Sequence, residues 1–393
     1  MLGVVSLAQF LGMTLWFSAT AVTPLLVREF DIPPGHVAWL TMAVQAGFVA
    51  GTLASAFANL ADVINARTLM FIGSLAGAAA NAAVIIAPGP TAVIVLRFLT
   101  GAALALVYPP GMKIAAGWFR DRRGFALGLL IGALTLGKAF PHLLTALFGD
   151  NWHQPMLLVS GLAALGGVMV LAVVRDGPYV AATAPFDPHA IRRILSSRGA
   201  RLATFGYLGH MWELYAMWTW VAVFAAASFT ASGMPNAGAA GSVAAFLAIG
   251  SGAAGCGLAG YLADRLGKAR VAMWAMLASA ACAALTVVAF GASPFWLYAL
   301  VMVWGFAVVA DSAQFSALVS EYAPPEHIGT ALTLQTCVGF LLTMVTIEGM
   351  PLLAEATSWQ YAALLLVPGP LLGAWAMKKL SHRGHREHRE RSF

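Results

Sequence analysis

The sequence predicts an all-α membrane protein with twelve transmembrane helices, arranged as two pseudo-symmetric six-helix bundles. Three observations lead to this fold class: the composition, the length of the apolar runs, and a short phrase that occurs twice. Of the 393 residues, 60% are hydrophobic and only 10% are charged, whereas a soluble domain carries about 25% charged residues. Such a chain is solvated by lipid, where every backbone polar group must find a partner within the protein.

Apolar runs of about 20 residues follow one another along the whole chain, which is the length that a spanning helix needs. The strands of a membrane barrel would instead alternate apolar and polar residues. We therefore expect twelve spanning helices, at 3–27, 37–60, 68–87, 91–117, 124–148, 155–174, 202–230, 238–262, 270–290, 294–319, 328–352 and 359–377.

The longest polar stretch between spans divides the chain into six helices plus six. We expect an N-terminal six-helix bundle at 1–175, a cytoplasmic central loop at 176–201, a C-terminal bundle at 202–378 and a basic tail at 379–393. Of the 22 lysines and arginines, 18 fall in the even-numbered loops and the tail. The positive-inside rule then predicts a multi-pass protein of the cytoplasmic (inner) membrane with both termini in the cytoplasm.

Several classes of function are disfavoured by composition and motifs. The net charge of +6 suits anionic lipid headgroups, and no basic patch with interleaved aromatic residues indicates nucleic acid. Cys256, Cys282 and Cys337 are scattered inside apolar runs, so we expect no disulfide framework and no metal site. The chain has no P-loop, nucleophile elbow or HExxH motif. We therefore expect no enzyme, no catalytic residue and no cofactor.

The repeated phrase occurs at two places 202 residues apart, each time between two long apolar runs. In both copies an acid, Asp62 or Asp264, ends one membrane-length helix, and a basic residue opens the next. The first copy matches the phrase less completely, because Ala58, Val63 and Asn65 replace the glycine, the basic residue and the second glycine of the other copy. A repeat of half a chain, carried by loops between spanning helices, favours a transporter built from two halves.

The phrase resembles the signature between helices 2 and 3 of the major facilitator superfamily: a glycine, an acid four residues on, then a second glycine among basic residues. The matching positions are Asp62 and Arg67 in the first copy and Gly260, Asp264, Arg265, Gly267, Lys268 and Arg270 in the second. In helix 4, Arg97 followed by Gly101 is also similar to a motif of this superfamily.

The resemblance covers essentially the whole chain and implies a bacterial-type twelve-helix member of the superfamily. Its implied architecture is two six-helix halves that rock about a midplane cavity lined by helices 1, 4, 7 and 10. It also implies that the acids and bases of the two loops form a gate, clamping the cytoplasmic helix ends in one state and releasing them in the other.

Ionisable residues inside the membrane are costly, so each is a candidate for function. Glu213 lies near the middle of helix 7, and His210 precedes it by three residues on the same helical face. A carboxylate beside a histidine can exchange protons, which makes this pair the first candidate for ion coupling. Asp311 in helix 10 is a second candidate.

Two cations and three indoles complete the set of candidate residues. Arg97 matches a family motif implicated in proton coupling, and Lys138 near the middle of helix 5 either binds an anionic substrate or neutralises an acid. Trp16, Trp212 and Trp218 lie toward the middle of their helices, where they form either a stacking wall for a substrate or plain packing.

The leading hypothesis is a secondary active transporter that moves a small solute by alternating access, driven by an ion gradient for which protons are the first candidate. Uniport or solute exchange is the alternative within this class. The buried cations favour a small organic anion as substrate. Proton-driven efflux of amphipathic or cationic compounds is the alternative, because Glu213 and Asp311 would suit a cation. A non-transporting membrane receptor or scaffold is a third hypothesis. The expected partners are the substrate, the coupling ion and the lipid bilayer, with the protein a monomer.

Overall fold

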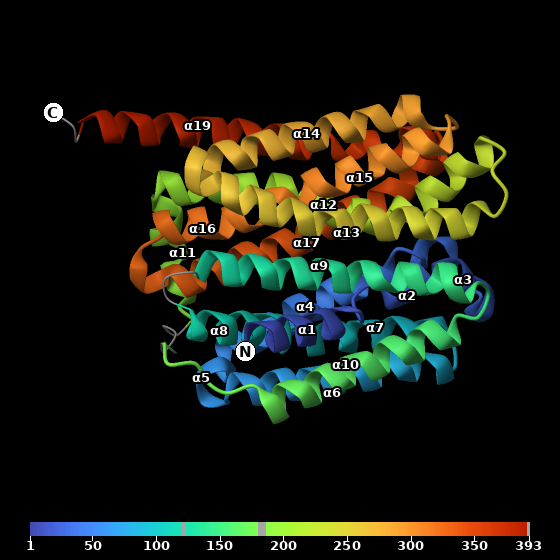
Figure 1. Ribbon diagram of the computed structural model, residues 1–393, viewed down its shortest axis with the longest axis horizontal. Helices are drawn as coiled ribbons and strands as arrows, with labels where there is room; N and C mark the ends of the chain where they lie inside the picture. Colours follow the sequence, from blue (N-terminus) through green and yellow to red (C-terminus); the bar gives the residue numbers. More distant parts are fainter. Residues whose placement is uncertain (120–122, 180–185, 391–393) are drawn as a thin grey trace.

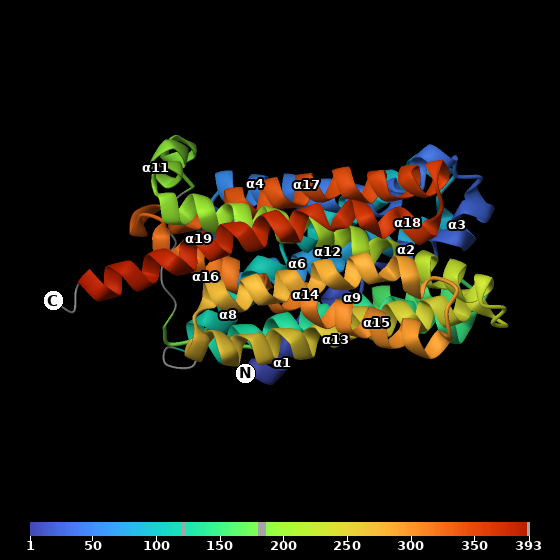
Figure 2. The same ribbon diagram turned by 90° about the horizontal axis from the view of Figure 1, so that it is seen from above.

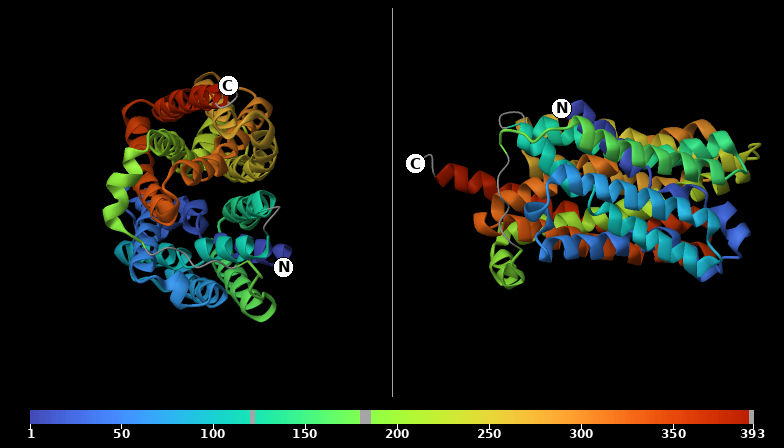
Figure 3. Two further views of the ribbon diagram at one scale, coloured as in Figure 1. Left: turned by 90° about the vertical axis from the view of Figure 1, so that its left-hand side faces the viewer. Right: turned by 90° about the horizontal axis from the view of Figure 1, so that it is seen from below.

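A computed structural model describes residues 1–119, 123–179 and 186–390, with the side chains of 61–62, 123–125 and 382–390 outside the described set. The described residues form helices and connecting turns (Figure 1). The helices lie side by side in two groups, and both chain termini lie toward the same end of the bundle, called here the terminal end (Figures 1 and 3).

In the first half the helices are α1 (Leu2–Met13), α2 (Ser18–Ala21), α3 (Thr23–Phe30), η1 (Pro34–His36), α4 (Trp39–Phe57), α5 (Leu60–Val63), α6 (Ala66–Ala83), η2 (Val84–Ile86), α7 (Pro90–Leu104), α8 (Tyr108–Trp118), α9 (Arg123–Phe148) and α10 (His153–Val173). The central loop contains η3 (Pro188–Ala190) and α11 (Ile191–Ser196). In the second half they are α12 (Arg198–Ala231), α13 (Ala237–Leu266), α14 (Lys268–Ala289), α15 (Pro294–Ala310), α16 (Ser312–Tyr322), η4 (Pro325–His327), α17 (Ile328–Ala356), α18 (Trp359–Ala362), η5 (Ala363–Leu366) and α19 (Pro368–Glu390).

Among the described residues, 11 helical segments are long and apolar enough to cross a membrane, and they coincide with the second to twelfth predicted spans. The first predicted span, 3–27, is not one continuous helix. It is divided into α1, α2 and α3, with turns at residues 14–17. The prediction from hydropathy was therefore right about the apolar run and wrong about its continuity.

Two further spans are broken near their middle, at matching places in the two halves. The fourth span breaks between α7 and α8, and the tenth breaks at Asp311 between α15 and α16. Pro109 and Pro110 lie in the first turn of α8, which begins at Tyr108. Proline lacks an N–H and is tolerated in the first turn of a helix but not in its interior. The double proline thus requires a new helix to start there.

Two pairs of helices make the most extensive contacts between the two halves among the described residues. α9 lies beside α13, and α4 lies beside α17 (Figures 1 and 2). Within the halves, small residues let backbones approach closely, as is usual where lipid surrounds the helices. A Cβ atom on Gly255 of α13, for example, would lie 2.2 Å from the carbonyl oxygen of Phe306 in α15.

We expect Gly255→Ala to lower the melting temperature of the detergent-purified protein, because a Cβ at that distance must push α13 and α15 apart. Overpacking of this kind costs about 1–3 kcal/mol. Gly257, on the same helix, has nothing within 4 Å of its would-be Cβ. The matched variant Gly257→Ala should leave stability unchanged or raise it, since alanine favours helix by about 1 kcal/mol. Equal shifts in the two variants would contradict this account of the packing.

Candidate functional site

Lys138 of α9 projects into a cluster of aromatic side chains and is only 3% exposed. Its ammonium nitrogen donates a hydrogen bond of 2.5 Å to the hydroxyl of Tyr215 in α12. The same nitrogen lies 4.2 Å from the ring centre of Trp16, 4.8 Å from that of Tyr215 and 5.3 Å from that of Trp218. Among the described residues, no carboxylate forms an ion pair with Lys138. The lysine is thus a buried cation held by ring faces and one hydroxyl.

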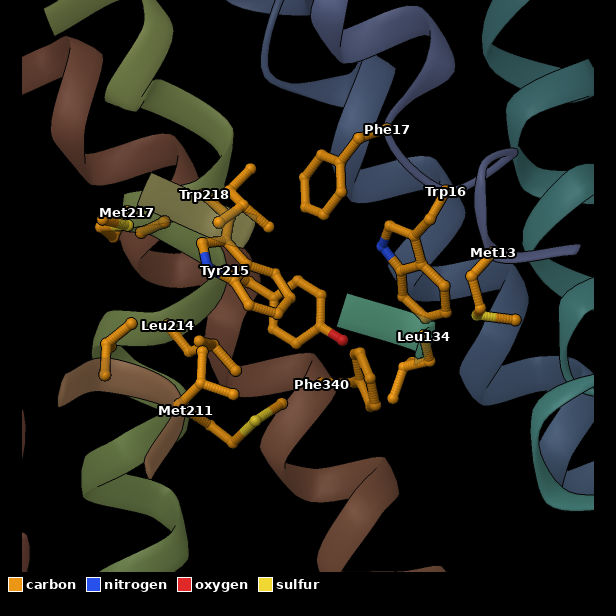
Figure 4. Packing of buried hydrophobic residues seen from close by; sticks show 14 of the residues in the cluster. Met13, Trp16, Phe17, Leu134, Met211, Leu214, Tyr215, Met217, Trp218 and Phe340 are labelled. Atoms are coloured by element: carbon orange, nitrogen blue, oxygen red, sulfur yellow. The ribbon is translucent and has the colours of Figure 1, made fainter. Parts of the chain in front are cut away.

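The aromatic cluster joins the two halves of the protein. Figure 4 shows the rings of Trp16, Phe17, Tyr215, Trp218 and Phe340 turned toward one another. Ring centres of Trp16 and Phe340 lie 5.5 Å apart, and those of Phe17 and Trp218 lie 6.0 Å apart. We call these five rings together with Lys138 the aromatic cage. The first span and α9 supply three of its members, whereas α12 and α17 of the second half supply the other three.

The break in the first span explains how two consecutive residues can both reach the cage. Neighbouring residues of a regular helix project about 100° apart, but Trp16 and Phe17 lie in the turns at 14–17. The hydroxyl of Thr14 donates to the carbonyl of Leu11 at 2.7 Å, and that of Ser18 donates to the carbonyl of Leu15 at 3.0 Å. These bonds satisfy carbonyls near the break and leave both rings fully buried.

Four polar atoms at the cage have no hydrogen-bond partner among the described residues. They are the indole nitrogens of Trp16 and Trp218 and both ring nitrogens of His142. His142 follows Lys138 by one turn of α9, and its ring lies 6.4 Å from that of Phe17. Because an unsatisfied buried polar group costs about 1–3 kcal/mol, several such atoms around one cation indicate a place where a ligand binds.

Arg97 of α7 lies elsewhere, inside the first half. It donates to the carbonyls of Leu15 and Trp16 at 3.1 and 2.7 Å, and to the side chains of Ser18 and Asn81 at 3.0 and 2.7 Å. A fifth, longer bond of 3.4 Å goes to a carbonyl of α4. All five N–H groups of the guanidinium are therefore used to hold the broken first span against its neighbours.

Glu213 of α12 also turns away from the cage, into the second half. One of its carboxylate oxygens accepts hydrogen bonds from Ser279 of α14 at 2.8 Å and from Trp304 of α15 at 2.6 Å. This contact ties the first, third and fourth spans of the second half together. The Arg97 contacts tie the corresponding three spans of the first half together, and also reach α4 of the second span.

His210 of α12 pairs with Asp311 and not with Glu213. Its Nδ1 lies 2.7 Å from a carboxylate oxygen of Asp311, and its Nε2 lies 2.8 Å from the hydroxyl of Ser312. Both partners lie where the tenth span is broken. The structure thus separates the expected Glu213–His210 pair into two contacts within the second half. Trp212 lies apart from both, with its indole donating to the carbonyl of Leu365 at 2.8 Å.

In the first loop phrase, Asn59 adopts the left-handed backbone conformation with φ +51 and precedes α5. The backbone of Asp62 belongs to α5, but its side chain lies outside the described residues. Arg67 begins the next span, pairs with Asp176 at 3.2 Å and donates to the carbonyl of Val174 at 2.8 Å. This contact joins the third and sixth spans of one half.

In the second loop phrase, Gly267 has φ +91 and ends α13, which a glycine does without strain. Lys268 pairs with Glu321 at the end of α16, and Arg265 lies over the ring of Tyr261 at 4.3 Å. Asp264 is exposed and forms no ion pair among the described residues. Two further motif positions are Gly260, in α13, and Arg270, in α14. The gating role of these residues stays a prediction.

Of the predicted site residues, the structure brings Lys138, Trp16 and Trp218 together in one cage. Sequence reasoning missed Tyr215 and His142, two polar members of this neighbourhood. A signal for His142 was available, because it stands four residues after Lys138 and therefore on the same helical face. Tyr215 carried a weaker signal, since its role depends on which face of α12 meets the first half. Among the described residues, no group of histidine, cysteine and acidic side chains could hold a metal ion.

Comparison with known proteins agrees with this architecture. A crystal structure of a mutant of the nucleoside transporter NupG is similar over 96% of this chain and 99% of that chain, with a TM-score of 0.70 and 16% sequence identity. At that identity the likeness concerns the fold. The sequence model of the Major Facilitator Superfamily matches residues 5–347 and, in a second alignment, 235–392. The chain is therefore a multi-pass membrane transporter that belongs to the Major Facilitator Superfamily.

Proposed function

We propose that this transporter moves a small organic anion by alternating access, with Lys138 as the residue that binds the anionic group. The observation that carries the proposal is a buried cation without a carboxylate partner, surrounded by donors that also have no partner among the described residues. A structural lysine would be expected to meet an acid, since isolated buried charges are strongly disfavoured. The cation–π contacts offset part of this cost, at about 0.5–2 kcal/mol each.

The alternative substrate, an amphipathic or cationic compound, would need an acid that faces the cage. The carboxylate of Glu213 accepts its two hydrogen bonds from Ser279 and Trp304. Asp311 lies against His210. Neither acid contacts a cage residue through a hydrogen bond or ion pair among the described residues. The arrangement therefore favours an anion over a cation.

Alternating access is supported by the position and burial of the cage. Its members come from both halves, and Trp16, Lys138, Trp218 and Tyr215 are between 1% and 4% exposed. A solute can reach a buried site between two halves only if the halves move relative to each other. A static receptor or scaffold has no need for a closed, charged site between two halves.

We also propose that protons drive transport and that the terminal end faces the cytoplasm. The first proposal rests on His210 and Asp311, a buried ionisable pair at the break of the tenth span. The second rests on the excess of lysine and arginine in the loops at the terminal end. If a membrane-impermeant reagent labelled a cysteine added to the tail in intact spheroplasts, the cytoplasmic placement would be wrong.

We expect Asp311→Asn to abolish gradient-driven accumulation in proteoliposomes but to spare exchange of substrate across the membrane. The asparagine keeps the size of the side chain but cannot take up and release a proton. Glu213→Gln is the matched variant, because Glu213 is the other buried acid of the second half. Loss of accumulation in Glu213→Gln alone would assign proton coupling to Glu213. Unchanged accumulation in both variants would show that neither acid carries the proton that drives transport.

The first experiment is a ligand-stabilisation screen on the detergent-purified protein with small organic acids, amines and nucleosides. A ligand that binds the folded state raises the melting temperature by mass action. Hits should then be tested for uptake into proteoliposomes. Stabilisation by acids would support the proposal, whereas stabilisation by amines alone would replace it with transport of cations.

A further inference from the structure

We infer that the substrate is an aromatic monocarboxylate, bound with its carboxylate against Lys138 and the indole N–H groups of Trp16 and Trp218. The inference rests on the proposed function and narrows its substrate class. It follows from two properties of the aromatic cage: the kind of polar atoms that lack partners, and the shape and chemistry of the surfaces around them.

The free polar atoms of the cage are those that a carboxylate would satisfy. An indole nitrogen can only donate a hydrogen bond, and an ammonium has three donors and no acceptor. Lys138 uses one donor toward Tyr215, and the indole nitrogens of Trp16 and Trp218 have no partner among the described residues. The rings of both tryptophans lie within 5.3 Å of the lysine nitrogen. A carboxylate, with two oxygens and about four lone-pair positions, is the kind of group that such donors bind.

Other tryptophans of the same helix show that these free donors are not a general property of the region. The indole of Trp212 donates to the carbonyl of Leu365, and that of Trp220 donates to the carbonyl of Ile347, both at 2.8 Å. Trp218 lies between them in the sequence, is buried like Trp220 and has no such partner in the described part of the chain. Of these three tryptophans of α12, the one whose ring lies near the Lys138 nitrogen is therefore the one whose N–H has no partner among the described residues.

The remaining surface of the cage determines which chemical group can be attached to the carboxylate of the substrate. Ring faces dominate it, with Phe17 stacked near Tyr215 at 6.2 Å and Phe340 at 5.0 Å from Tyr215. Sugars and nucleosides carry several hydroxyls that need partners, and a zwitterionic amino acid needs an acid for its ammonium group. Among the described residues, no acid forms an ion pair or hydrogen bond with a cage residue, and the carboxylate would occupy the free indole donors. A flat apolar body meets these faces without leaving a polar group unsatisfied.

Planarity matters because the rings of the cage already contact one another. Atoms in van der Waals contact lie about 3.5–4.0 Å apart, so a flat ring requires the cage to widen by roughly that amount. A saturated ring of the same size is thicker and lacks the π face. We therefore expect discrimination between acids that differ only in planarity.

The test compares benzoate with cyclohexanecarboxylate, which has the same number of carbon atoms, on the full-length purified protein. Affinity for each probe is measured by thermal stabilisation and by competition for uptake in proteoliposomes. Benzoate should bind about tenfold more tightly, and Trp218→Phe and Trp16→Phe should each weaken benzoate binding roughly five- to tenfold by removing one hydrogen bond. Trp212→Phe is the matched control and should leave both affinities unchanged.

The outcomes separate the inference from the proposed function. Equal affinities for the two acids, both lost in Lys138→Gln, would overturn the aromatic substrate and leave the organic anion standing. Unchanged benzoate affinity in both Trp16→Phe and Trp218→Phe would overturn the role of the indole donors. Absence of binding for every organic acid would overturn the proposed function and the inference together.

Discussion

Replacing Lys138 with glutamine is expected to abolish binding of the transported anion and, at the same time, to raise the melting temperature of the ligand-free protein. The two effects have one cause. The ammonium is buried without a carboxylate partner among the described residues, so its charge carries a desolvation cost that Tyr215 and the ring faces only partly offset. Removing it relieves that cost, and removes the charge that the substrate needs.

The expected loss of affinity is large. A hydrogen bond to a charged group contributes about 1.5–3 kcal/mol, which corresponds to roughly 10- to 150-fold in affinity. Exclusion of water from the site further strengthens the electrostatic attraction between the lysine and an anion. Lys138→Arg keeps the charge and serves as the control, with binding weakened but present. The measurement is the melting temperature with and without ligand. A glutamine variant that is less stable when empty and binds as tightly as the original would contradict the substrate role of Lys138.

Replacing Arg97 with glutamine should destabilise the protein far more than Gly255→Ala does. The guanidinium satisfies acceptors on the broken first span, on α4 and on α6. Glutamine is shorter, donates two hydrogens and cannot reach all of them. Each acceptor left without a partner costs about 1–3 kcal/mol, so we expect a strongly lowered melting temperature or loss of folded protein. Arg97→Lys should share this defect, because one ammonium cannot replace a planar fork of five donors.

The control for Arg97 is Arg28→Gln, at the end of the molecule away from the termini. Its guanidinium pairs with Asp150 at 3.4 Å, and both side chains are largely exposed. Exposed pairs contribute about 0–1 kcal/mol, so the melting temperature should hardly change. The family resemblance gives Arg97 a role in proton coupling. A folded, fully stable Arg97→Gln protein whose transport no longer depends on pH would establish that role and contradict the structural one.

The residues of the seventh span show how far sequence reasoning could go. Glu213 and Tyr215 have nearly the same depth along α12, so both are candidates by position alone. They project about 200° apart around the helix axis. The structure turns Tyr215 toward Lys138 in the first half and Glu213 toward Ser279 and Trp304 within the second half. Rotation of a helix about its axis depends on its neighbours, and a nearly uniformly apolar span carries little pattern that reveals it.

The breaks in the first, fourth and tenth spans differ in how well they can be predicted from the sequence. The fourth is marked by Pro109 and Pro110, which must start a helix. The turns at 14–17 carry no proline and no glycine, and they persist because Arg97 satisfies the carbonyls that the break exposes. An interruption at Leu15 that is stabilised by a residue 82 positions further along the chain is a property of the tertiary structure.

The sequence by itself therefore determined the fold class, the second to twelfth spans and the superfamily. These depend on the length of apolar runs and on short loop phrases, because lipid requires each span to satisfy its own backbone locally. Only the tertiary structure decided which buried charges meet. Lys138 contacts aromatic rings of the opposite half, whereas Arg97, Glu213 and Asp311 contact partners within their own halves. The partners of a buried charge in a helix bundle depend on the rotation of each helix and on packing between segments that are distant in the sequence.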